Sequence, residues 1–317
     1  MKIQFGIIGV FTIFITSINP GYSQAIKGIE DKTKAELETI NSRIEYFYTK
    51  EFADSLLGFY DKSFTFLPEY KPEIYMGKDL QKFYTDWFKA VEIKAYKKNI
   101  YEVEAIAGYI LEIGNFSLRY SIKPGTENEY TGKYMTMWKR NAAGKLNILS
   151  EAFGSDKHIG PEDIPYAMVE VKKSRFLEKN IVSKKLQPAI EEFDKGVVKA
   201  VMDGDGAERA NEFTKDGIYM PHFDPMQIGM DRIRPYMLKT YSKAGVFAYV
   251  KDTYREIFDS GEFVFISGHF KVGWDNARNK GDFEGDMSNL MKRGADGKLL
   301  MYRQLAHNDG RSVSINK

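Results

Sequence analysis

A segment near the middle of the chain returns near its end, and this internal repeat limits the possible folds more than any other feature. The stretch GKYMTMWKRNAAGKLNILSEAFGSD at 132–156 aligns without gaps with GDMSNLMKRGADGKLLMYRQLAHND at 285–309, with eight identities in 25 positions and a separation of 153 residues. The same separation relates Pro68 and Pro72 to Pro221 and Pro225. Because repeats at a fixed period are copies of one structural unit, we predict two copies of a single fold.

Each copy has the same predicted order of helices and strands. Apolar residues at helical spacing predict three helices per copy, at 33–50, 52–60 and 78–89, and at 187–203, 206–214 and 231–243. A short strand (64–67 and 218–220) follows the second helix, and four longer strands rich in Tyr, Ile, Val and Phe complete the copy. Ala143-Gly144 and Asp296-Gly297 predict turns between the last two strands. The predicted class is α+β: two tandem cone-shaped units, each with three helices packed on a curved antiparallel sheet.

The repeat also sets the predicted domain limits. We place the first unit at 30–156, a linker at 157–185 and the second unit at 186–310; Gly160, Pro161 and Pro165 begin the linker. Each sheet has an outer face that would otherwise expose apolar strands. We therefore expect the two units to pack as an intramolecular pseudo-dimer bridged by the linker, and a further homo-oligomer is an open alternative.

The N-terminal residues 1–23 have the pattern of an export signal. Lys2 supplies a positive start, 5–18 is an uncharged, mostly apolar run, and Gly21 and Ser23 precede a predicted cleavage before Gln24. The apolar run is short for a membrane span of about 20 residues. We expect a secreted protein, periplasmic or extracellular, without a membrane partner once the signal is removed.

Composition excludes several classes of function. The chain has no cysteine, so disulfides and thiolate catalysis are excluded. The net charge is only +2 and no basic stripe stands out, which argues against a nucleic-acid partner. The aromatic share of 14% is enough to line or fill a cavity.

The predicted order of elements resembles that of the nuclear-transport-factor-2-like superfamily, which includes the SnoaL-like polyketide cyclases and the ketosteroid isomerases. The stretch at 132–156 is similar to the SnoaL-like ending, and LPEYKPEIYMGKDLQKFY and MPHFDPMQIGMDRIRPY are similar to the family's proline loop, glycine and third helix. The resemblance covers nearly all of the mature chain except the linker. It implies a cone with a pocket but not one function, because the superfamily includes isomerases, cyclases, dehydratases and binding domains.

The isomerase mechanism of that superfamily does not carry over to this chain. The position of the catalytic Asp corresponds to Leu67 or Pro68 in the first copy and to Met220 in the second. The acid that stabilises the oxyanion corresponds to Thr136 and Asn289, which are weaker donors.

The resemblance also implies which side chains face the inside of each cone, because alternate residues of a strand share a face. In the first copy these candidate ligand-binding residues are Trp87, Tyr134, Thr136, Trp138, Leu149, Glu151 and Phe153. In the second copy they are Met287, Asn289, Met291, Tyr302, Gln304 and Ala306. We expect the first copy to have the better pocket, since rigid aromatic rings there surround one acid. The alternative is that the same side chains fill the cone as core.

Glu151 is the best candidate for a catalytic residue, because it interrupts the apolar strand LNILSEAF. A buried carboxylate must be hydrogen-bonded, paired or protonated. Arg119 on a neighbouring strand would lower its pKa, and Glu112 would raise it. A structural ion pair is the alternative to a catalytic role.

Three of the four histidines, His222, His269 and His307, lie in the second copy, but no HxH or HxxxH pair occurs. We therefore expect isolated polar histidines, and neither a metal site nor a cofactor. The run Asp203-Gly204-Asp205-Gly206 lacks the distal ligands of a calcium loop, and a connection between helices explains it better.

The leading interpretation is a secreted SnoaL-like protein that binds a small, partly apolar molecule in a cone-shaped pocket. Two alternatives stay open: an acid-base enzyme of the same superfamily, of isomerase, cyclase or dehydratase type, and a structural pairing module with vestigial pockets. The sequence does not decide whether the chain is an enzyme, and it does not identify the ligand.

Overall fold

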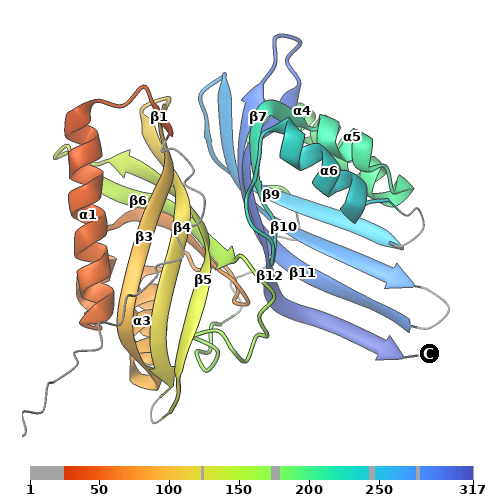
Figure 1. Ribbon diagram of the computed structural model, residues 1–317. Helices are drawn as coiled ribbons and strands as arrows, with labels where there is room; N and C mark the ends of the chain where they lie inside the picture. Colours follow the sequence, from red (N-terminus) through yellow and green to blue (C-terminus); the bar gives the residue numbers. More distant parts are fainter. Residues whose placement is uncertain (1–24, 123–124, 173–178, 243–246, 276–278, 317) are drawn as a thin grey trace, which may run out of the picture.

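A computed structural model describes residues 25–122, 125–172, 179–242, 247–275 and 279–316. Two similar α+β units stand side by side, with their sheets facing each other in the middle and their helices on the outside (Figure 1). The predicted fold class is confirmed. The predicted signal segment 1–23 lies outside the described residues.

In its described residues, the first unit has three helices and six strands. Its elements are β1 (Ala25–Lys27), α1 (Asp31–Thr49), α2 (Ala53–Leu57), β2 (Tyr60–Pro68), α3 (Gly77–Ala90), β3 (Val91–Ile106), β4 (Tyr109–Ile122), β5 (Glu127–Arg140) and β6 (Leu146–Ser155). The strand order is β1-β3-β4-β5-β6-β2. The four long strands are antiparallel, while β1 and β2 pair in parallel at the two edges.

The second unit repeats this plan. Its elements are α4 (Gln187–Asp203), α5 (Gly206–Asn211), β7 (Phe213–Met220), β8 (Gln227–Ile228), α6 (Met230–Thr240), β9 (Tyr249–Asp259), β10 (Phe263–Asp275), β11 (Asn279–Arg293) and β12 (Leu299–Asn316). The strand order is β8-β7-β12-β11-β10-β9. The predicted turns between the last two strands are present, and Gly144 and Gly297 adopt the positive φ angles of 77° and 84° that such turns require.

The helices form where apolar residues recur on one face. In α1 the buried side chains Leu37, Ile40, Ile44 and Tyr48 follow the three- and four-residue spacing of a helical stripe. In α4 the stripe is Ile190, Phe193, Val197 and Val201, at the corresponding positions. These stripes cover the concave faces of the two sheets, so each cone has its own core.

The outer faces of the two sheets pack against each other, which is the pairing that the sequence predicts. We call this contact the seam. Its apolar side chains come from both units: Leu67, Ile106, Leu111, Ile113, Met135, Met137, Leu149, Ala152, Ile218, Met220, Met226, Phe258, Phe263, Phe265, Leu290, Tyr302 and Leu305. The rings of Tyr109 and Phe258 stack across it with centroids 4.2 Å apart. Covering two apolar sheet faces at once is the main favourable contribution of this contact.

A buried ion pair crosses the seam. The Nε and Nη2 atoms of Arg303 lie 2.7 and 2.9 Å from the two carboxylate oxygens of Glu102. The third guanidinium nitrogen donates to the carbonyls of Asp216 and Tyr302, so the buried cation is well hydrogen-bonded.

Residues that correspond in the repeat also meet at the seam. Glu69 and His222 are 153 residues apart in the sequence, and their Oε1 and Nδ1 atoms are 3.1 Å apart. Gly154 and His307 have the same separation, and a Cβ on Gly154 would lie 3.4 Å from that of His307. Contacts between equivalent residues are the signature of an approximate twofold axis.

The segment between the units packs on the first cone. Ile164, Tyr166 and Val169 are buried among the core residues of the first unit. The ring of Tyr166 lies 5.1 Å from that of Trp87 and 5.4 Å from that of Phe83, measured between centroids.

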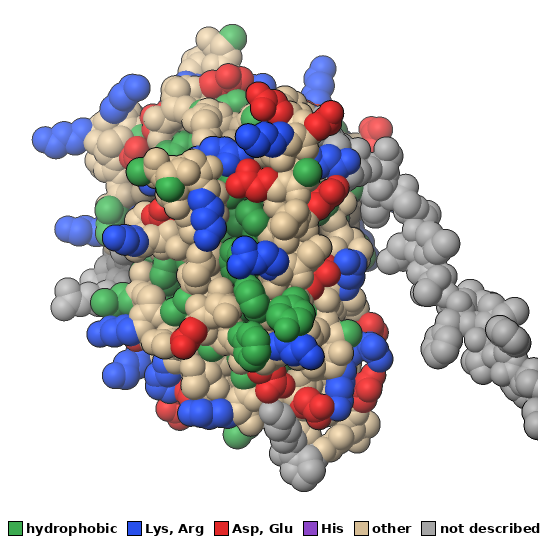
Figure 2. Space-filling model, turned by 90° about the vertical axis from the view of Figure 1, so that its left-hand side faces the viewer, with side chains coloured by type: hydrophobic (Ala, Val, Ile, Leu, Met, Phe, Trp, Pro, Cys, Tyr) green, Lys and Arg blue, Asp and Glu red, His purple; other side chains and the backbone are tan. Residues whose placement is uncertain are grey.

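The face of the first unit that bears α1 is shown in Figure 2. Basic and acidic side chains are interspersed over it, with a small group of hydrophobic side chains near its lower centre. Within the described part of the chain, none of the helices has the length and apolar character needed to cross a bilayer.

Candidate functional site

The first cone is filled by its own side chains. Among the described residues, a cavity of about 20 Å³ remains between Tyr48, Trp87, Tyr134, Glu151 and Phe153, which is room for about one water molecule. Between these residues the first copy therefore lacks the roomy pocket that we expected. The aromatic side chains that we assigned to a ligand site contact one another instead, and the alternative of a filled core describes this unit.

Glu112 of β4 accepts the hydrogen bonds of the polar groups that are buried in this aromatic core. Its carboxylate accepts hydrogen bonds from the Tyr134 hydroxyl at 2.7 Å, the Trp138 ring nitrogen at 3.0 Å and the Asn41 amide at 2.9 Å. The ammonium group of Lys98 lies 3.1 Å from the same carboxylate. Tyr134 and Trp138 are thus engaged within the protein, and Thr136 between them is fully buried.

Glu151 does face the inside of the first cone, as the register predicted, but in a closed environment. The hydroxyl of Tyr60 donates to its carboxylate. Burial raises the pKa of Glu151, the nearby Lys98 opposes this rise, and Glu112 adds to it. Arg119, which we considered as a partner, pairs with Glu127 instead. In a cone of this size the Glu151 carboxyl reaches only protein atoms and about one water, which favours a structural role.

Two predicted residues lie on the opposite face of their strands because of β-bulges. In β6 the pairing shifts beside Trp138, so Ile148 faces the cone and Leu149 faces the seam. In β12 the pairing shifts beside Met291, so Met301 faces the cone and Tyr302 faces the seam. A bulge adds one residue and reverses the alternation beyond it. The Tyr302 hydroxyl accordingly contacts Glu104 of the first unit at 2.8 Å.

The second cone, in contrast, contains a cavity of about 270 Å³. We call it the second-unit cavity. Apolar side chains from α4, β9, β10 and β11 line most of it, among them Phe193, Val197, Val250, Phe270 and Phe283. This is room for a small organic molecule.

Substitutions at equivalent positions of the repeat explain why one cone is filled and the other is hollow. Tyr134 and Thr136 of β5 correspond to Met287 and Asn289 of β11, and Trp138 corresponds to Met291. Phe153 of β6 corresponds to Ala306 of β12, and Trp87 corresponds to Thr240. Each of these four rings of the first unit is replaced by a smaller or more flexible side chain, and Met287 and Ala306 among the replacements line the second-unit cavity.

A chain of hydrogen bonds in the cavity wall leaves two donors without an acceptor. Arg209 Nη2 donates to Gln304 Oε1 at 3.4 Å, and Gln304 Nε2 donates to Asn289 Oδ1 at 3.0 Å. Arg209 Nη1 and Asn289 Nδ2 then have no partner among the described residues, although Arg209 is only 6% exposed and Asn289 is fully buried. A buried donor without an acceptor costs about 1–3 kcal/mol. An acceptor group that reached these two donors would remove this cost.

The connection between α4 and α5 places Arg209. Gly204 ends α4 in the left-handed conformation with φ 68°. The Asp205 side chain then caps α5 by accepting from the backbone N–H groups of Ala207 and Glu208. This confirms that the Asp-Gly-Asp-Gly run connects two helices. It also turns the short helix so that Arg209 lines the second-unit cavity.

A carboxyl group with an unusual environment lies in the same wall. The hydroxyl of Tyr254 lies 3.3 Å from Asp252 Oδ2 and 3.0 Å from Asp194 Oδ1, so one hydroxyl bridges two carboxyl groups. Burial and the neighbouring Asp194 raise the pKa of Asp252 to about 7, although Arg209 opposes the rise. Asp252 Oδ1 has no partner among the described residues and belongs to a cavity-lining side chain.

Asp252 should make stability depend on pH. Its folded pKa of about 7 exceeds the value of about 3.9 for an unfolded Asp, so the folded chain binds the proton more tightly. The free energy of unfolding should then fall as pH rises from about 4 to 7, with a slope of at most about 1.4 kcal/mol per pH unit from this group. Urea unfolding at a series of pH values should show a flatter dependence for Asp252→Asn. The exposed Asp231→Asn is the control, and parallel curves for wild type and Asp252→Asn would contradict the expectation.

Of the residues predicted for the second copy, Asn289 and Gln304 are brought together in the cavity, while Tyr302 is not. Sequence reasoning missed Arg209, Asp252 and His222 as lining residues. The repeat contained a signal for the first of them, because Arg209 corresponds to Leu56, a fully apolar core position of the first unit. A cation at the equivalent of a buried leucine indicates that the interiors of the two copies differ.

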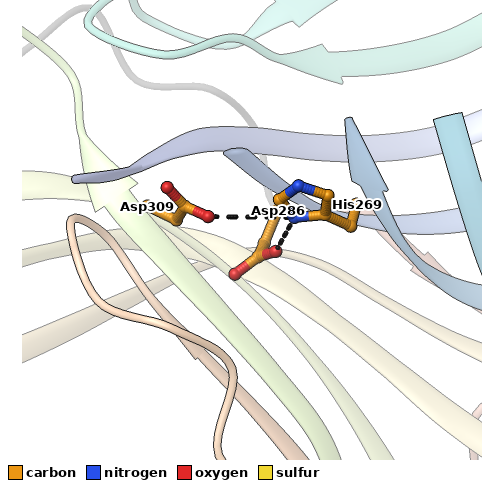
Figure 3. A group of neighbouring side chains, drawn as sticks. All are labelled: His269, Asp286 and Asp309. Carbon is orange, nitrogen blue, oxygen red and sulfur yellow. Dashed lines mark hydrogen bonds and ion pairs between the residues drawn. The ribbon is translucent and has the colours of Figure 1, made fainter. Parts of the chain in front are cut away.

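A buried histidine and two aspartates form a separate group beside the seam (Figure 3). His269 Nδ1 lies 2.9 Å from Asp286 Oδ1 and 3.8 Å from Asp309 Oδ2. One imidazole and two carboxylates are donors that a divalent cation accepts. In this group, however, His269 already forms a hydrogen bond with Asp286. The other two histidines of the unit lie elsewhere, His222 beside Glu69 and His307 with its Nε2 3.0 Å from the carbonyl of Leu67.

The fold and the cavity define a class: a two-unit α+β protein in which one cone is filled and the other holds a pocket lined by apolar and a few polar groups. No protein-family model and no curated protein matches the chain. Among solved structures, it is similar to a ketosteroid isomerase-like protein from Erwinia carotovora (15% identity, TM-score 0.34, covering 40% of this chain and 98% of that chain). It is also similar to an NTF-2 like protein of unknown function from Shewanella oneidensis (14%, 0.33, 38% and 98%).

A third similar structure is a protein from Catenulispora acidiphila in complex with S-DNPA (18% identity, TM-score 0.33, covering 41% of this chain and 97% of that chain). Each of these structures spans about 40% of the chain, the length of a single unit. At these identities and scores no function passes from them to this chain.

Proposed function

We propose that this chain is an exported small-molecule-binding protein whose second unit holds the ligand. The observation that supports this most directly is the pair of buried, unpartnered donors, Arg209 Nη1 and Asn289 Nδ2, in the wall of the second-unit cavity. Together with the apolar remainder of the wall, they suit a partly apolar molecule with an anionic or strongly accepting oxygen. The N-terminal pattern of residues 1–23 supports export. N-terminal sequencing of the mature protein would test the expected start at Gln24.

The energetics favour such a ligand over an uncharged hydrocarbon. An oxyanion in front of Arg209 and Asn289 forms charge-assisted hydrogen bonds in a water-poor site, which are stronger than neutral ones. A hydrocarbon would leave both donors without an acceptor. Arg209 also stacks over the ring of Phe213, with Cζ 5.2 Å from the centroid, so its position is fixed before a ligand arrives.

The test uses 8-anilinonaphthalene-1-sulfonate, an aromatic anion, as the probe. Fluorescence titration should show saturable binding to the wild type. Arg209→Gln should weaken this binding about 10- to 100-fold, the effect of one hydrogen bond to a charged group. The same change should alter the binding of the uncharged 2-methoxynaphthalene much less.

The matched control is Arg232→Gln, which removes an exposed arginine of α6 outside the cavity. Thermal unfolding of each variant shows whether the fold is intact. Equal affinity of the wild type and a folded Arg209→Gln for the sulfonate would refute the assigned binding mode. Absence of saturable binding to the wild type would refute the second-unit cavity as a ligand site.

Acid-base catalysis in the same cavity is the second candidate function, and one observation favours it. Asp252 has a pKa of about 7 and an oxygen without a partner among the described residues, which is the state a group needs to exchange protons near neutral pH. This moves the candidate catalytic carboxyl from Glu151 to Asp252. A molecule that co-purifies with Asp252→Asn but is recovered in altered form from the wild type would favour the enzyme over the binding protein.

A further inference from the structure

The imidazole of His222 connects the second-unit cavity with the first unit. His222 follows β7 and lines the cavity. Its Nδ1 atom lies 3.1 Å from Oε1 of Glu69, which belongs to the first unit and follows β2. Its Nε2 atom is buried and has no partner among the residues that the structure describes. One edge of the ring is thus held by the first unit, and the nitrogen on the other edge has no partner among the described residues.

Glu69 is ionised and tightly held. Besides His222, its carboxylate accepts from the Tyr130 hydroxyl at 2.7 Å and from the backbone N–H and hydroxyl of Ser155 at 2.9 and 2.8 Å. Burial alone would raise the pKa of Glu69, but these hydrogen bonds, with the largest contribution from His222, lower it to about 2. An ionised carboxylate only accepts hydrogen bonds, so a contact with it requires a proton on the facing ring nitrogen.

This contact selects one tautomer of His222. The backbone N–H of Asn308 lies 3.3 Å from the same Nδ1 atom, and a ring nitrogen cannot accept and donate at once. The shorter contact with a charged carboxylate is the stronger one, so Nδ1 carries the proton. In the neutral ring Nε2 then has a lone pair directed away from Glu69.

Burial is the main reason why the ring of His222 is neutral near pH 7. Burial lowers the pKa of His222, and the nearby His307 and Lys133 lower it further, while Glu69 raises it; the net shift is downward. Burial also lowers the pKa of Lys133 to about 8. Nε2 of His222 is therefore a hydrogen-bond acceptor rather than a donor.

The repeat shows why this arrangement exists only in the duplicated chain. Glu69 and His222 are equivalent residues that meet near the approximate twofold axis of the seam. In a pair of identical units, each would face a copy of itself. Here the two copies have diverged into a carboxylate and an imidazole, and the imidazole lines the hollow cone.

We propose that His222 accepts a hydrogen bond from a hydroxyl group of the molecule bound in the second-unit cavity, and that Glu69 is its positioning residue. The inference rests on the proposed function and narrows the ligand class. The molecule is partly apolar, has an accepting oxygen for Arg209 and Asn289, and has a donor hydroxyl for His222. The first unit then contributes to the site through Glu69, although its own cone is filled.

The test compares 2-naphthol, which has a donor hydroxyl, with 2-methoxynaphthalene, which does not. Wild type should bind 2-naphthol about tenfold more tightly, the effect of about one hydrogen bond. His222→Phe should bind both compounds equally, and Glu69→Gln should lose part of the preference because the tautomer is no longer fixed. Glu162→Gln, an exposed carboxylate of the segment between the units, is the control and should keep the full preference.

Ring-nitrogen NMR shifts of His222, assigned by comparison with His222→Phe, give a readout that needs no ligand. The wild type should show the Nδ1-protonated tautomer, and Glu69→Gln should show a mixture. A preference for 2-naphthol that persists in His222→Phe would overturn the proposal, as would an Nε2-protonated ring in the wild type. If neither naphthalene nor the sulfonate probe binds the folded wild type, the proposed function fails, and the NMR shifts still decide whether Glu69 fixes the ring.

Discussion

Replacing Arg303 with methionine is expected to lower the free energy of unfolding by about 3–5 kcal/mol. The Arg303 and Glu102 side chains are only 1% and 3% exposed, so the change leaves a carboxylate buried in the seam without its main partner. Lys27 is 3.4 Å from Glu102 and is partly exposed, which keeps the loss near the lower end of that range. Since domains are stable by about 5–15 kcal/mol, urea unfolding should resolve the change easily.

Two further variants distinguish the contribution of the buried charge to stability from that of side-chain packing. Arg303→Met combined with Glu102→Met should recover most of the loss, because an apolar pair of similar volume replaces the ion pair. Arg119→Met removes an arginine from the exposed pair with Glu127, 3.0 Å apart and about half exposed, and should cost less than about 1 kcal/mol. A loss below 1 kcal/mol for Arg303→Met would show that the seam does not depend on this pair.

Exchanging one residue between the two cones should fill the cavity of the second cone and open a void in the first. Ala306→Phe places in the second-unit cavity the ring that Phe153 supplies in the first cone. Because the ring enters open space, stability should change little, while the affinity for the sulfonate probe should fall at least about a hundredfold, or about 2.7 kcal/mol. Fluorescence titration and thermal unfolding of the same variant measure both effects.

The reverse change, Phe153→Ala, should instead lower the stability strongly. Phe153 contacts the rings of Phe66, Phe116 and Tyr166, so its removal leaves a void and should cost about 3–5 kcal/mol. Strong destabilisation by Ala306→Phe with unchanged probe binding would show that the second-unit cavity is not where the probe binds.

The fold was predictable because its signals are local and occur twice. Helical stripes such as Leu37, Ile40 and Ile44, the turns at Gly144 and Gly297, and a constant separation of 153 residues do not depend on distant contacts. Which face of its strand a side chain occupies was predictable only up to the first β-bulge. One extra residue beside Trp138 and one beside Met291 were enough to turn Leu149 and Tyr302 to the seam.

The choice of pocket was not predictable, because an empty volume is a property of all the side chains around it. The aromatic residues that suggested a binding site, Trp87, Tyr134 and Phe153, are large enough to fill the cone that they line. Whether they do so depends also on Tyr166, which lies far along the chain in the segment between the units. The role of polar residues such as Arg209 and His222 depends on partners in other elements or in the other unit, which the sequence does not reveal.

Tyr166 shows how two copies of one fold can come to differ inside. Its ring packs against the rings of Phe83, Trp87 and Phe153. Because Tyr166 belongs to the segment between the units, a side chain from outside the repeat completes the aromatic core of the first cone. The two cones thus share one plan of helices and strands, and the interior of one can be filled while that of the other stays open.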